Sequence, residues 1–485
     1  MKAYDAVVVG SGPNGLAAAV ALAKAGHSVK VVEGQSTLGG GARTLPLTLP
    51  GFQHDLCSAI HPMALGSPYF AELELEKHGV EYVHSPFPLV HPIGAHAAIL
   101  ERGVEATAAR LGPDEKAWLN LMKPLARDFD VLKRFMYYPV TSPPLNAPIA
   151  AANFGLKALQ SAFWFAEENF ETPAAKALLA GCAAHSFSAL TTPLTNSFAL
   201  LLAVSAQAIG WPLVRGGSQK LIDAMLALLL RSGGEVERDQ PITSLDQLPP
   251  SKLVLFDTHA HVVERICGEA LPGWYRALLR HFKPGPGVFK LDYALSAPMP
   301  WLAESCRGAA TLHLGGTMPE LAESEARVER GDFPEKPYVL VAQQSLFDDS
   351  RAPAGQHTLW AYCHVPNGSD VDATEQIEAQ LERYAPGFQK LVLAKAAKRT
   401  SHMEAMNAAY VGGDISGGAV EGLQIVMRPA PGFSHATPNP KLMFCGASSP
   451  PGPAVHGMCG YWAAQTAIQK LRSLSPAGER VGVRG

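Results

Sequence analysis

The stretch "YDAVVVGSGPNGLAAAVALAKAGHSVKVVEG", residues 4–34, decides the fold of this chain. Ala6–Val9 is a short apolar run bounded by glycine, which predicts a buried strand. The Ala- and Leu-rich run Leu16–Ala25 predicts a helix that Gly26 ends. Ser28–Val32 is a second apolar run, and it leads into Glu33. Strand, helix and strand in this order predict the opening of a Rossmann-type α/β domain.

The turn between the first strand and the helix has the G-x-G-x-x-G pattern of dinucleotide-binding proteins. Gly10 allows the tight turn, Gly12 lets a pyrophosphate approach the backbone, and Gly15 lets the helix pack on the strand. The helix N-terminus offers unpaired N–H groups to the phosphates. Glu33, about 20 residues downstream, is placed to accept hydrogen bonds from ribose hydroxyls. We expect the cofactor to contact Gly10, Ser11, Gly12, Pro13, Asn14, Gly15, Glu33 and Gly34.

A second glycine-rich segment follows Glu33 after five residues and reads Gly39-Gly40-Gly41-Ala42-Arg43-Thr44. A simple NAD enzyme has no need of this segment. The spacing resembles the flavoprotein extension of the fingerprint, in which these positions contact the FAD pyrophosphate and the approach to the flavin. The alternative interpretation is an ordinary glycine turn with an exposed arginine. The resemblance implies FAD as the cofactor, contacted by Gly40, Gly41, Ala42, Arg43 and Thr44.

The composition favours a globular, somewhat apolar protein. The chain has 485 residues, of which 47% are hydrophobic and 17% charged, and its formal net charge is -3. This length predicts two domains, or one domain with a large insertion. No long basic block is present, so nothing favours nucleic acid as a partner.

The seven cysteines include no Cys-x-x-Cys pair, which predicts reduced, mostly buried thiols, a cytoplasmic setting and no dithiol redox centre. We expect no cleaved targeting segment, because cleavage would remove the glycine motif. The stretch 197–213, "SFALLLAVSAQAIGWPL", is the nearest approach to a membrane span, but it is short and Pro212 ends it. A core helix is the better interpretation.

Several further blocks carry a resemblance to a known family. They are "LPGFQHDLCSAIHPMALGSPYF" (49–70), "GWPLVRGGSQKLIDAMLALLLRSGGEV" (210–236), "GPGVFKLDYAL" (285–295), "HLGGT" (313–317), "GGDISGG" (412–418) and "CGASSPPGPAVHGMCGYWAAQ" (445–465). With them, nearly the whole chain resembles the phytoene-desaturase-like FAD oxidoreductases, and most of all the branch of pyridine nucleotide-disulphide oxidoreductase domain-containing proteins. Two departures are Ala260, where relatives often carry proline, and the missing dithiol.

The resemblance implies that the C-terminal segment returns to the first domain and completes the FAD site. Residues 441–447, "KLMFCGA", are expected to form the last strand of its sheet, and a new helix is expected to start between Ala454 and Cys459, aimed at the flavin. His456 is either near the flavin ring or packed within the turn. The middle part of the chain predicts a helix from Ser218 to Arg231, followed by two strands around Val236 and Ile242. The resemblance implies that the backbone at Ile242 holds the adenine. The implied cofactor contacts here are Gly446, Ala447, Val455, His456, Gly457 and Met458.

The resemblance also implies a division of the chain. Residues 1–72, 208–262 and 428–485 are expected to form a discontinuous FAD-binding domain of the glutathione-reductase/amine-oxidase kind. Residues 73–207, as a helical part, and 263–427, as a mixed sheet, are expected to form the substrate domain. Because a second G-x-G-x-x-G is absent, we expect no separate NAD(P)H domain. If NAD(P)H reacts with the flavin, it must then enter the substrate site. The alternative is that the flavin takes hydride from the organic substrate and passes the electrons to oxygen, a quinone or another acceptor.

The sequence indicates the catalytic residues less clearly than the cofactor contacts. Ser58, Ala59 and His61 follow the second glycine segment, so they are expected near the reacting edge of the flavin, with Ser58 and Ala59 as cofactor contacts. His61 is either a base or the residue that caps the turn before Pro62. His185 lies on an apolar segment, so a buried core histidine is the better interpretation and a catalytic role is the weaker one. His259 and His261 lack a further ligand at suitable spacing, so we expect no metal.

Three functions stay open from the sequence. The first is an FAD-dependent dehydrogenase or desaturase that transfers hydride from a hydrophobic substrate, such as an isoprenoid, to flavin N5. The second is a flavin amine oxidase, and the third is a flavoprotein whose FAD is structural and which acts by binding a partner. The apolar character of residues 130–207 suggests peripheral contact with a membrane. The oligomeric state is open.

Overall fold

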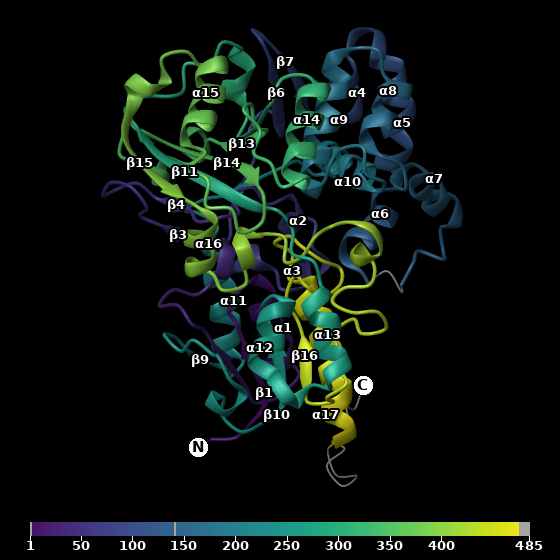
Figure 1. The fold of residues 1–485 in the computed structure, drawn as a ribbon, viewed down its shortest axis with the longest axis vertical. Coiled ribbons are helices and arrows are strands. Elements are labelled where there is room, and N and C mark those ends of the chain that lie inside the picture. Colours follow the sequence, from purple (N-terminus) through teal and green to yellow (C-terminus); the bar gives the residue numbers. More distant parts are fainter. Residues whose placement is uncertain (1, 140–141, 475–485) are drawn as a thin grey trace.

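The computed structural model describes residues 2–139 and 142–474. Figure 1 shows a lower part that contains the N-terminus and helix α17, and an upper part in which a second sheet lies beside a group of helices. The lower part is built on a five-stranded parallel sheet in the order β16-β10-β1-β2-β9. Its strands are β1 (Tyr4–Val9), β2 (Val29–Val32), β9 (Glu235–Glu237), β10 (Ser251–Phe256) and β16 (Leu442–Phe444).

These strands come from the three segments assigned to the FAD-binding domain, and the predicted α/β fold class is confirmed. The first helix, α1 (Pro13–Lys24), begins three residues before the predicted start at Leu16. Pro13 is the first helical residue, because its fixed φ suits that position and its missing N–H is not needed there. Helix α11 (Gln219–Arg231) precedes β9, as the sequence predicts.

The prediction of a strand around Ile242 is wrong. Ile242 lies in irregular backbone that includes Asp239, with a φ of 57°, and Pro241. A positive φ interrupts an extended strand, and proline has no N–H to donate to a neighbouring strand. The next strand is β10, which lies between β16 and β1.

The upper part contains a seven-stranded mixed sheet in the order β15-β11-β14-β13-β12-β6-β7. Its pairs are antiparallel except β12 with β6. Two of its strands belong to residues 73–207, so that segment is not purely helical as predicted. The strands are β6 (Leu89–Ile93), β7 (His96–Leu100), β11 (Gly287–Leu295), β12 (Thr311–Leu314), β13 (Val339–Ala342), β14 (His357–Val365) and β15 (Val392–Lys398).

A helical layer lies beside this sheet in Figure 1. It is formed by α4 (Val104–Ala108), α5 (Glu115–Arg127), α6 (Phe129–Tyr137), α7 (Pro148–Ala158), α8 (Ala162–Asn169), α9 (Pro173–Ala183) and α10 (Thr195–Ala208). The apolar stretch 197–213 falls largely on α10, which packs against α9 and is a core helix as expected. Within the described ranges, no helix is long and apolar enough to cross a membrane.

The remaining elements are shorter connections and covering helices. They are α2 (Pro62–Leu65), α3 (Pro68–Glu72), α12 (Ala260–Cys267), α13 (Gly273–His281), α14 (Met318–Glu329), α15 (Thr374–Tyr384), α16 (Thr400–Met406), β3 (Thr44–Leu45), β4 (His54–Asp55), β5 (Tyr82–Val83) and β8 (Leu213–Val214).

A buried ionic cluster joins the two parts. The guanidinium of Arg351 contacts the carboxylate of Asp55 and lies 3.2 Å from that of Asp348. Asp55 also accepts hydrogen bonds from the hydroxyl of Thr44 at 2.7 Å and the backbone N–H of Ser218 at 2.9 Å. Burial opposes ionisation of Asp55, but Arg351 and these hydrogen bonds hold its pKa below the usual value. The cluster therefore fixes the second glycine segment against the upper part.

The last helix, α17 (Met458–Leu474), begins within the predicted range and packs across α1. A Cβ placed on Gly460 would lie 1.8 Å from the backbone oxygen of Asn14, an overlap that neither backbone can relieve without moving. Glycine at this position therefore lets the C-terminal helix close on the first turn of α1.

We expect Gly460→Ala to lower the stability of the protein by about 1–3 kcal/mol, because the added methyl group overpacks the α1–α17 contact. Gly155→Ala is the matched control, since Gly155 also lies within a helix but a Cβ there would meet nothing within 4 Å. The control is expected to be neutral or to stabilise by about 0.5–1 kcal/mol. Melting temperatures of both variants test this, and an unchanged melting temperature for Gly460→Ala would contradict it.

Candidate functional site

A cavity of about 910 Å³ runs from the turn of β1 and α1 to the seven-stranded sheet. Its glycine end is lined by Gly10, Ser11, Gly12, Pro13, Asn14, Glu33, Gly34, Gln35, Gln240, Pro241, Ile242, Thr243 and Asp257. Its sheet end is lined by His185, Phe187, Phe198, Leu201, Leu202, Trp211, Thr311, Leu340, Ala342, Trp360 and Tyr362. The two glycine segments and the turn before α17 thus share one cavity with the upper part.

The carboxylate of Glu33 is held in place at the glycine end. One of its oxygens accepts hydrogen bonds from the backbone N–H and the hydroxyl of Ser11, at 2.9 and 2.5 Å, and the other accepts the N–H of Gln35 at 2.9 Å. The hydroxyl of Ser11 in turn accepts the N–H of Gly39 at 3.1 Å. The acid that the sequence predicts for the ribose is therefore fixed by both glycine segments.

Asp257, which follows β10, is a site residue that the sequence interpretation missed. Its carboxylate accepts the N–H of Gly15 at 2.8 Å, and a Cβ on Gly12 would lie 2.5 Å from the same oxygen. Burial, together with the nearby charge of Glu33, raises the pKa of Asp257 to about 7. An acid directly after the apolar run "LVLF" was the signal, because the carboxyl ends of parallel strands form the ligand-binding edge of such a sheet.

The second glycine segment packs directly on the first. A Cβ on Gly40 would lie 3.2 Å from the Cα of Gly12. Arg43 is only 3% exposed, so the alternative of an exposed arginine is wrong. Its guanidinium donates to the backbone oxygen of Gly40 at 2.8 Å and to that of Met406 at 2.5 Å. The segment therefore forms a wall of the cavity.

Most of the predicted site residues line the cavity. Besides the glycine end, they include Gly40, Gly41, Ala42, Arg43, Ser58, Ala59, His61, His185, Ala447 and Val455. Six others lie outside the lining: Gly15, Thr44, Gly446, His456, Gly457 and Met458.

Each of those six is engaged elsewhere. Gly15 bonds to Asp257, against which Gly446 also lies, and Thr44 bonds to Asp55. The ring of His456 accepts the N–H of Met458 at 2.9 Å, and a Cβ on Gly457 would lie 2.5 Å from Phe70. His456 thus packs within the turn and caps α17, which was one of the two positions left open for it.

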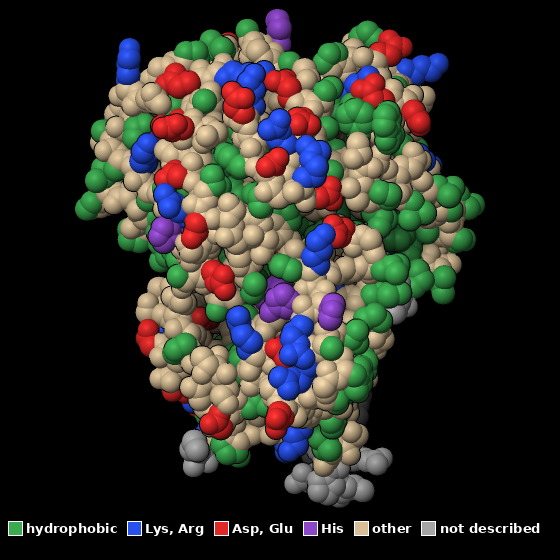
Figure 2. All heavy atoms as spheres, in the orientation of Figure 1, with side chains coloured by type: hydrophobic (Ala, Val, Ile, Leu, Met, Phe, Trp, Pro, Cys, Tyr) green, Lys and Arg blue, Asp and Glu red, His purple; other side chains and the backbone are tan. Residues whose placement is uncertain are grey.

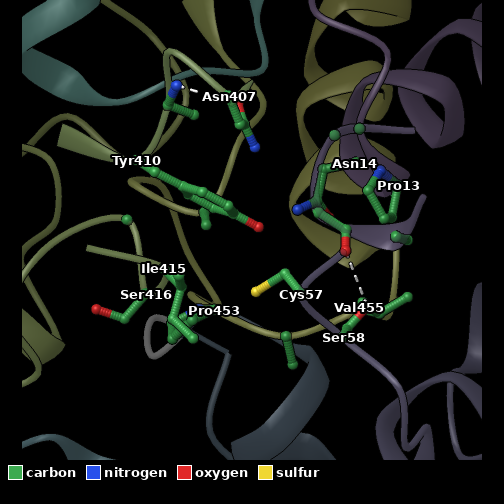
Figure 3. Close-up of a pocket in the computed structure, with 18 of the residues that line it drawn as sticks. Pro13, Asn14, Cys57, Ser58, Asn407, Tyr410, Ile415, Ser416, Pro453 and Val455 are labelled. Atoms are coloured by element: carbon green, nitrogen blue, oxygen red, sulfur yellow. Dashed lines mark hydrogen bonds between the residues drawn. The ribbon is translucent and has the colours of Figure 1, made fainter. Parts of the chain in front are cut away.

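The middle of the cavity is crossed by Tyr410, which the sequence interpretation did not single out. Figure 3 shows its side chain reaching toward Asn14, with the sulfur of Cys57 pointing into the space below it. A Cβ on Gly41 would lie 1.8 Å from the Tyr410 hydroxyl oxygen, so a larger residue at position 41 would have to displace the Tyr410 side chain. Burial raises the pKa of the Cys57 thiol, which argues against a reactive thiolate.

His61 lines the cavity and has one free ring nitrogen. Its Nε2 lies 2.8 Å from the hydroxyl oxygen of Ser218, and that hydroxyl donates to the backbone oxygen of Ser58 at 2.6 Å. Because the Ser218 hydroxyl already donates to Ser58, it can only accept from His61, so His61 donates through Nε2. Its Nδ1 is then an acceptor without a partner. Burial lowers the pKa of His61 to about 4, so the ring is neutral at pH 7.

The floor of the sheet end is one face of the seven-stranded sheet. Thr311 pairs with Ala342, which pairs with Trp360, and His313 pairs with Leu340, which pairs with Tyr362. Partners in a register point to the same side, so these six side chains share a face. Five of the six line the cavity, and His313 lies beneath His185 with their Nε2 atoms 3.0 Å apart.

Charges are unevenly distributed along the cavity. Glu33 and Asp257 are the acids in its lining, and both belong to the glycine end. The lining arginines are Arg43, Arg265 and Arg428, none of which belongs to the sheet end. His259 also lines the cavity, and its Nε2 lies 4.0 Å from a carboxylate oxygen of Asp414. Across the described part of the chain, no group of three metal-ligating side chains comes together.

Comparisons with known proteins agree with this geometry. Residues 8–73 match the NAD(P)-binding Rossmann-like domain. The chain is 25% identical to pyridine nucleotide-disulfide oxidoreductase domain-containing protein 2 of Rattus norvegicus, over 97% of this chain and 94% of that protein. The match to the Mus musculus protein of the same name is also 25% identical.

Solved structures share the fold across the whole chain. An oxidoreductase from Methanosarcina mazei superposes with a TM-score of 0.64 at 16% identity and covers 96% of this chain and 99% of its own. Wild-type putrescine oxidase bound to putrescine superposes with a TM-score of 0.61 at 17% identity, over 97% of this chain and 99% of its own. The chain therefore has the amine-oxidase-like fold: a Rossmann-type domain with a mixed sheet and helices.

We expect the ionisation of Asp257 to make the protein without cofactor less stable as the pH rises. Its folded pKa of about 7 exceeds the unfolded value of 3.8, so the folded state binds the extra proton between these values. The contribution is fully present below pH 3.8 and is lost as the pH rises through 7, and it amounts to at most about 4 kcal/mol. Asp257→Asn should remove this part of the pH dependence.

Urea unfolding midpoints measured from pH 4 to pH 8 test the expectation. Asp349→Asn is the control, because the side chain of Asp349 is 99% exposed. Its midpoints should follow those of the wild type at every pH. Parallel curves for Asp257→Asn and the wild type would show that Asp257 titrates normally.

Proposed function

We propose that this chain is an FAD-dependent oxidoreductase that takes hydride from a hydrophobic substrate such as an isoprenoid. The observation that carries the proposal is the continuity of the cavity. One end is built from the two glycine segments and Glu33, and the other end is uncharged and largely aromatic or aliphatic. Such a cavity suits a dinucleotide at one end and an apolar molecule at the other.

The residues at the glycine end fit FAD. Gly12 and Gly40 line the cavity beside the start of α1, where the first N–H groups of the helix suit a pyrophosphate. The fixed carboxylate of Glu33 suits ribose hydroxyls, and the loop that carries Ile242 suits the adenine. The buried Oδ1 of Asn14 is an acceptor without a partner. When bound, FAD supplies a hydride acceptor, while the protein orients the substrate and excludes water.

Flavin amine oxidase is the second candidate, and the superposition with putrescine oxidase favours it. The distribution of charge favours the hydrophobic substrate instead. An amine enters as a cation, and burial of an unpaired cation is costly. The sheet end carries no carboxylate in its lining to balance that charge.

The purified protein is expected to show the visible absorption of oxidised flavin, either as isolated or after addition of FAD. Glu33→Ala should weaken FAD binding about 10- to 100-fold, because charge-assisted hydrogen bonds to the ribose are lost. Glu329→Ala, on the exposed side of α14, is the control and should bind FAD as the wild type does. The absence of flavin after reconstitution would overturn the proposal.

Anaerobic titration of the flavin then separates the candidate functions. Bleaching by an isoprenoid or another apolar reductant supports the proposed activity, and bleaching by a polyamine supports the amine oxidase. A flavin that no compound of either class reduces, in a protein that captures a partner, would favour the third function, with a structural FAD. NADH and NADPH belong in the same series as reductants.

Peripheral contact with a bilayer is a second part of this proposal. Large apolar side chains are exposed near α7, among them Leu145 at 82%, Ile149 at 85% and Leu156 at 70%. Figure 2 shows hydrophobic side chains gathered on this side of the molecule. Phe135 of α6 lines the cavity, is 38% exposed and packs on Phe154 of α7 at 4.9 Å between ring centroids. Phe135 therefore links the cavity to the helix that carries the exposed patch, which supports transfer of an apolar substrate from a membrane.

We expect the protein to float with liposomes and the double variant Ile149→Asp/Leu156→Asp to stay at the bottom of the gradient, because charge opposes burial of α7 in lipid. The flavin content of the variant should match that of the wild type, since neither residue lines the cavity. A wild-type protein that does not float would contradict membrane contact and leave the redox proposal intact.

A further inference from the structure

A pair of neutral histidines marks the sheet end of the cavity. His185 lies in the short 3-10 helix, residues 184–186, that follows α9, and it lines the cavity. Its Nε2 lies 3.0 Å from the Nε2 of His313 on β12. Gly181 of α9 makes room for the pair, because a Cβ there would lie 2.5 Å from the Nδ1 of His313. His185 is thus held from behind and faces the cavity.

The hydrogen bond between the two rings leaves His185 able to donate or accept. One Nε2 must donate and the other must accept, so each ring carries a single proton. If His185 donates, its Nδ1 is a free acceptor; if His313 donates, the Nδ1 of His185 carries the proton. A hydroxyl group both donates and accepts, so it satisfies His185 in either arrangement. A carbonyl oxygen satisfies one arrangement, and a hydrocarbon satisfies neither.

Two other polar groups on this face have no partner. The hydroxyl of Thr311 and the indole N–H of Trp360 are buried without a hydrogen bond within the described residues, and both side chains line the cavity. Thr311 is two residues from His313 on the same strand, about 7 Å along it. All three cavity-facing groups are uncharged, which matches a ligand with one neutral polar group on an apolar body.

The surroundings disfavour a cation. Two acids near this wall are already held by other side chains. Glu325 is held by His364 at 2.6 Å, and the ring of His364 stacks on Phe187 with 4.0 Å between centroids. Asp292, which pairs with Trp360 in the register of the sheet, contacts Lys290 and accepts a hydrogen bond from Lys398 at 2.7 Å. Burial lowers the pKa of His185 to about 3, so the ring is neutral at pH 7. A protonated amine at this end therefore contacts no lining carboxylate that could balance its charge.

We propose that the sheet end binds an alcohol: an apolar substrate with one hydroxyl group, which hydrogen-bonds to His185 while His313 holds the imidazole in place. That the alcohol is a substrate rests on the proposed function. That a hydroxyl group binds His185 rests on the groups that line the cavity. His185 is assigned the binding of the hydroxyl group.

Three acyclic terpenes serve as matched probes: geraniol, geranylamine and the hydrocarbon myrcene. Tryptophan fluorescence reports their binding at pH 7, because Trp211 and Trp360 line this end of the cavity. Geraniol is expected to bind about tenfold more tightly than either of the others. Tighter binding of geranylamine, or equal binding of all three, would overturn the proposal even without a variant.

His185→Leu should bring the affinities of geraniol and myrcene within about twofold of each other, and His185→Gln, whose amide both donates and accepts, should restore part of the preference. His435→Leu is the control, because His435 is also buried but does not line the cavity. Its preference should equal that of the wild type. A preference for geraniol that persists in His185→Leu would overturn the assignment.

The flavin spectrum, recorded on the same samples, keeps the two proposals apart. Absence of flavin with the preference for geraniol intact would overturn the redox function and retain the alcohol site. Bound flavin without a preference for geraniol would retain the redox function and overturn the alcohol site.

Discussion

The close contact of backbone at the turn of residues 10–15 is the constraint on which the rest of this structure depends. Asp257, directly after β10, presses on Gly10, Gly12 and Gly15, and α17 reaches the backbone oxygen of Asn14 through Gly460. Segments from the beginning, middle and end of the chain therefore meet at one turn. None of these contacts has room for a Cβ, so the three segments pack backbone against backbone at this turn.

The buried cluster around Arg351 extends this constraint to the second part of the molecule. Asp55 follows the second glycine segment and contacts Arg351, which lies between β13 and β14 in the chain. Thr44 and Ser218 bond to the same carboxylate, so the walls of the glycine end are tied to the sheet that floors the other end. If the two parts moved apart, the buried charges of this cluster would lose their partners, which is strongly unfavourable. The cluster therefore fixes how the two parts are placed.

The cavity that results separates charge from apolar surface. Its carboxylates, Glu33 and Asp257, and its arginines lie away from the sheet end, where histidine, threonine and tryptophan supply uncharged polar groups. A dinucleotide needs hydrogen bonds and compensation of charge, whereas an apolar substrate needs a dry surface and few polar contacts. One continuous space can serve both because the two kinds of lining come from different layers of the fold.

The βαβ unit and the core helix α10 could be predicted from sequence, because glycine spacing and apolar periodicity are local properties. The start of α17 followed from the resemblance to a known family. Glu33 and the glycines of the first two segments could likewise be assigned to a dinucleotide site. The strand expected around Ile242 does not form, because Pro241 has no N–H to donate to a neighbouring strand and Asp239 has a positive φ. The sequence leaves open whether the Arg43 side chain is exposed to solvent, because a local pattern carries no information on what covers a side chain.

The contacts of Asp257 and Tyr410 and the pairing of His185 with His313 were decided by tertiary structure. Their partners lie far away in the chain: Gly15 for Asp257, Gly41 for Tyr410, and a strand 128 residues further on for His185. No local period links such positions. The sequence by itself determined a Rossmann-type α/β domain with a dinucleotide turn. Only the packing of distant segments decided which polar groups face the cavity, because burial and hydrogen bonding depend on neighbours in space.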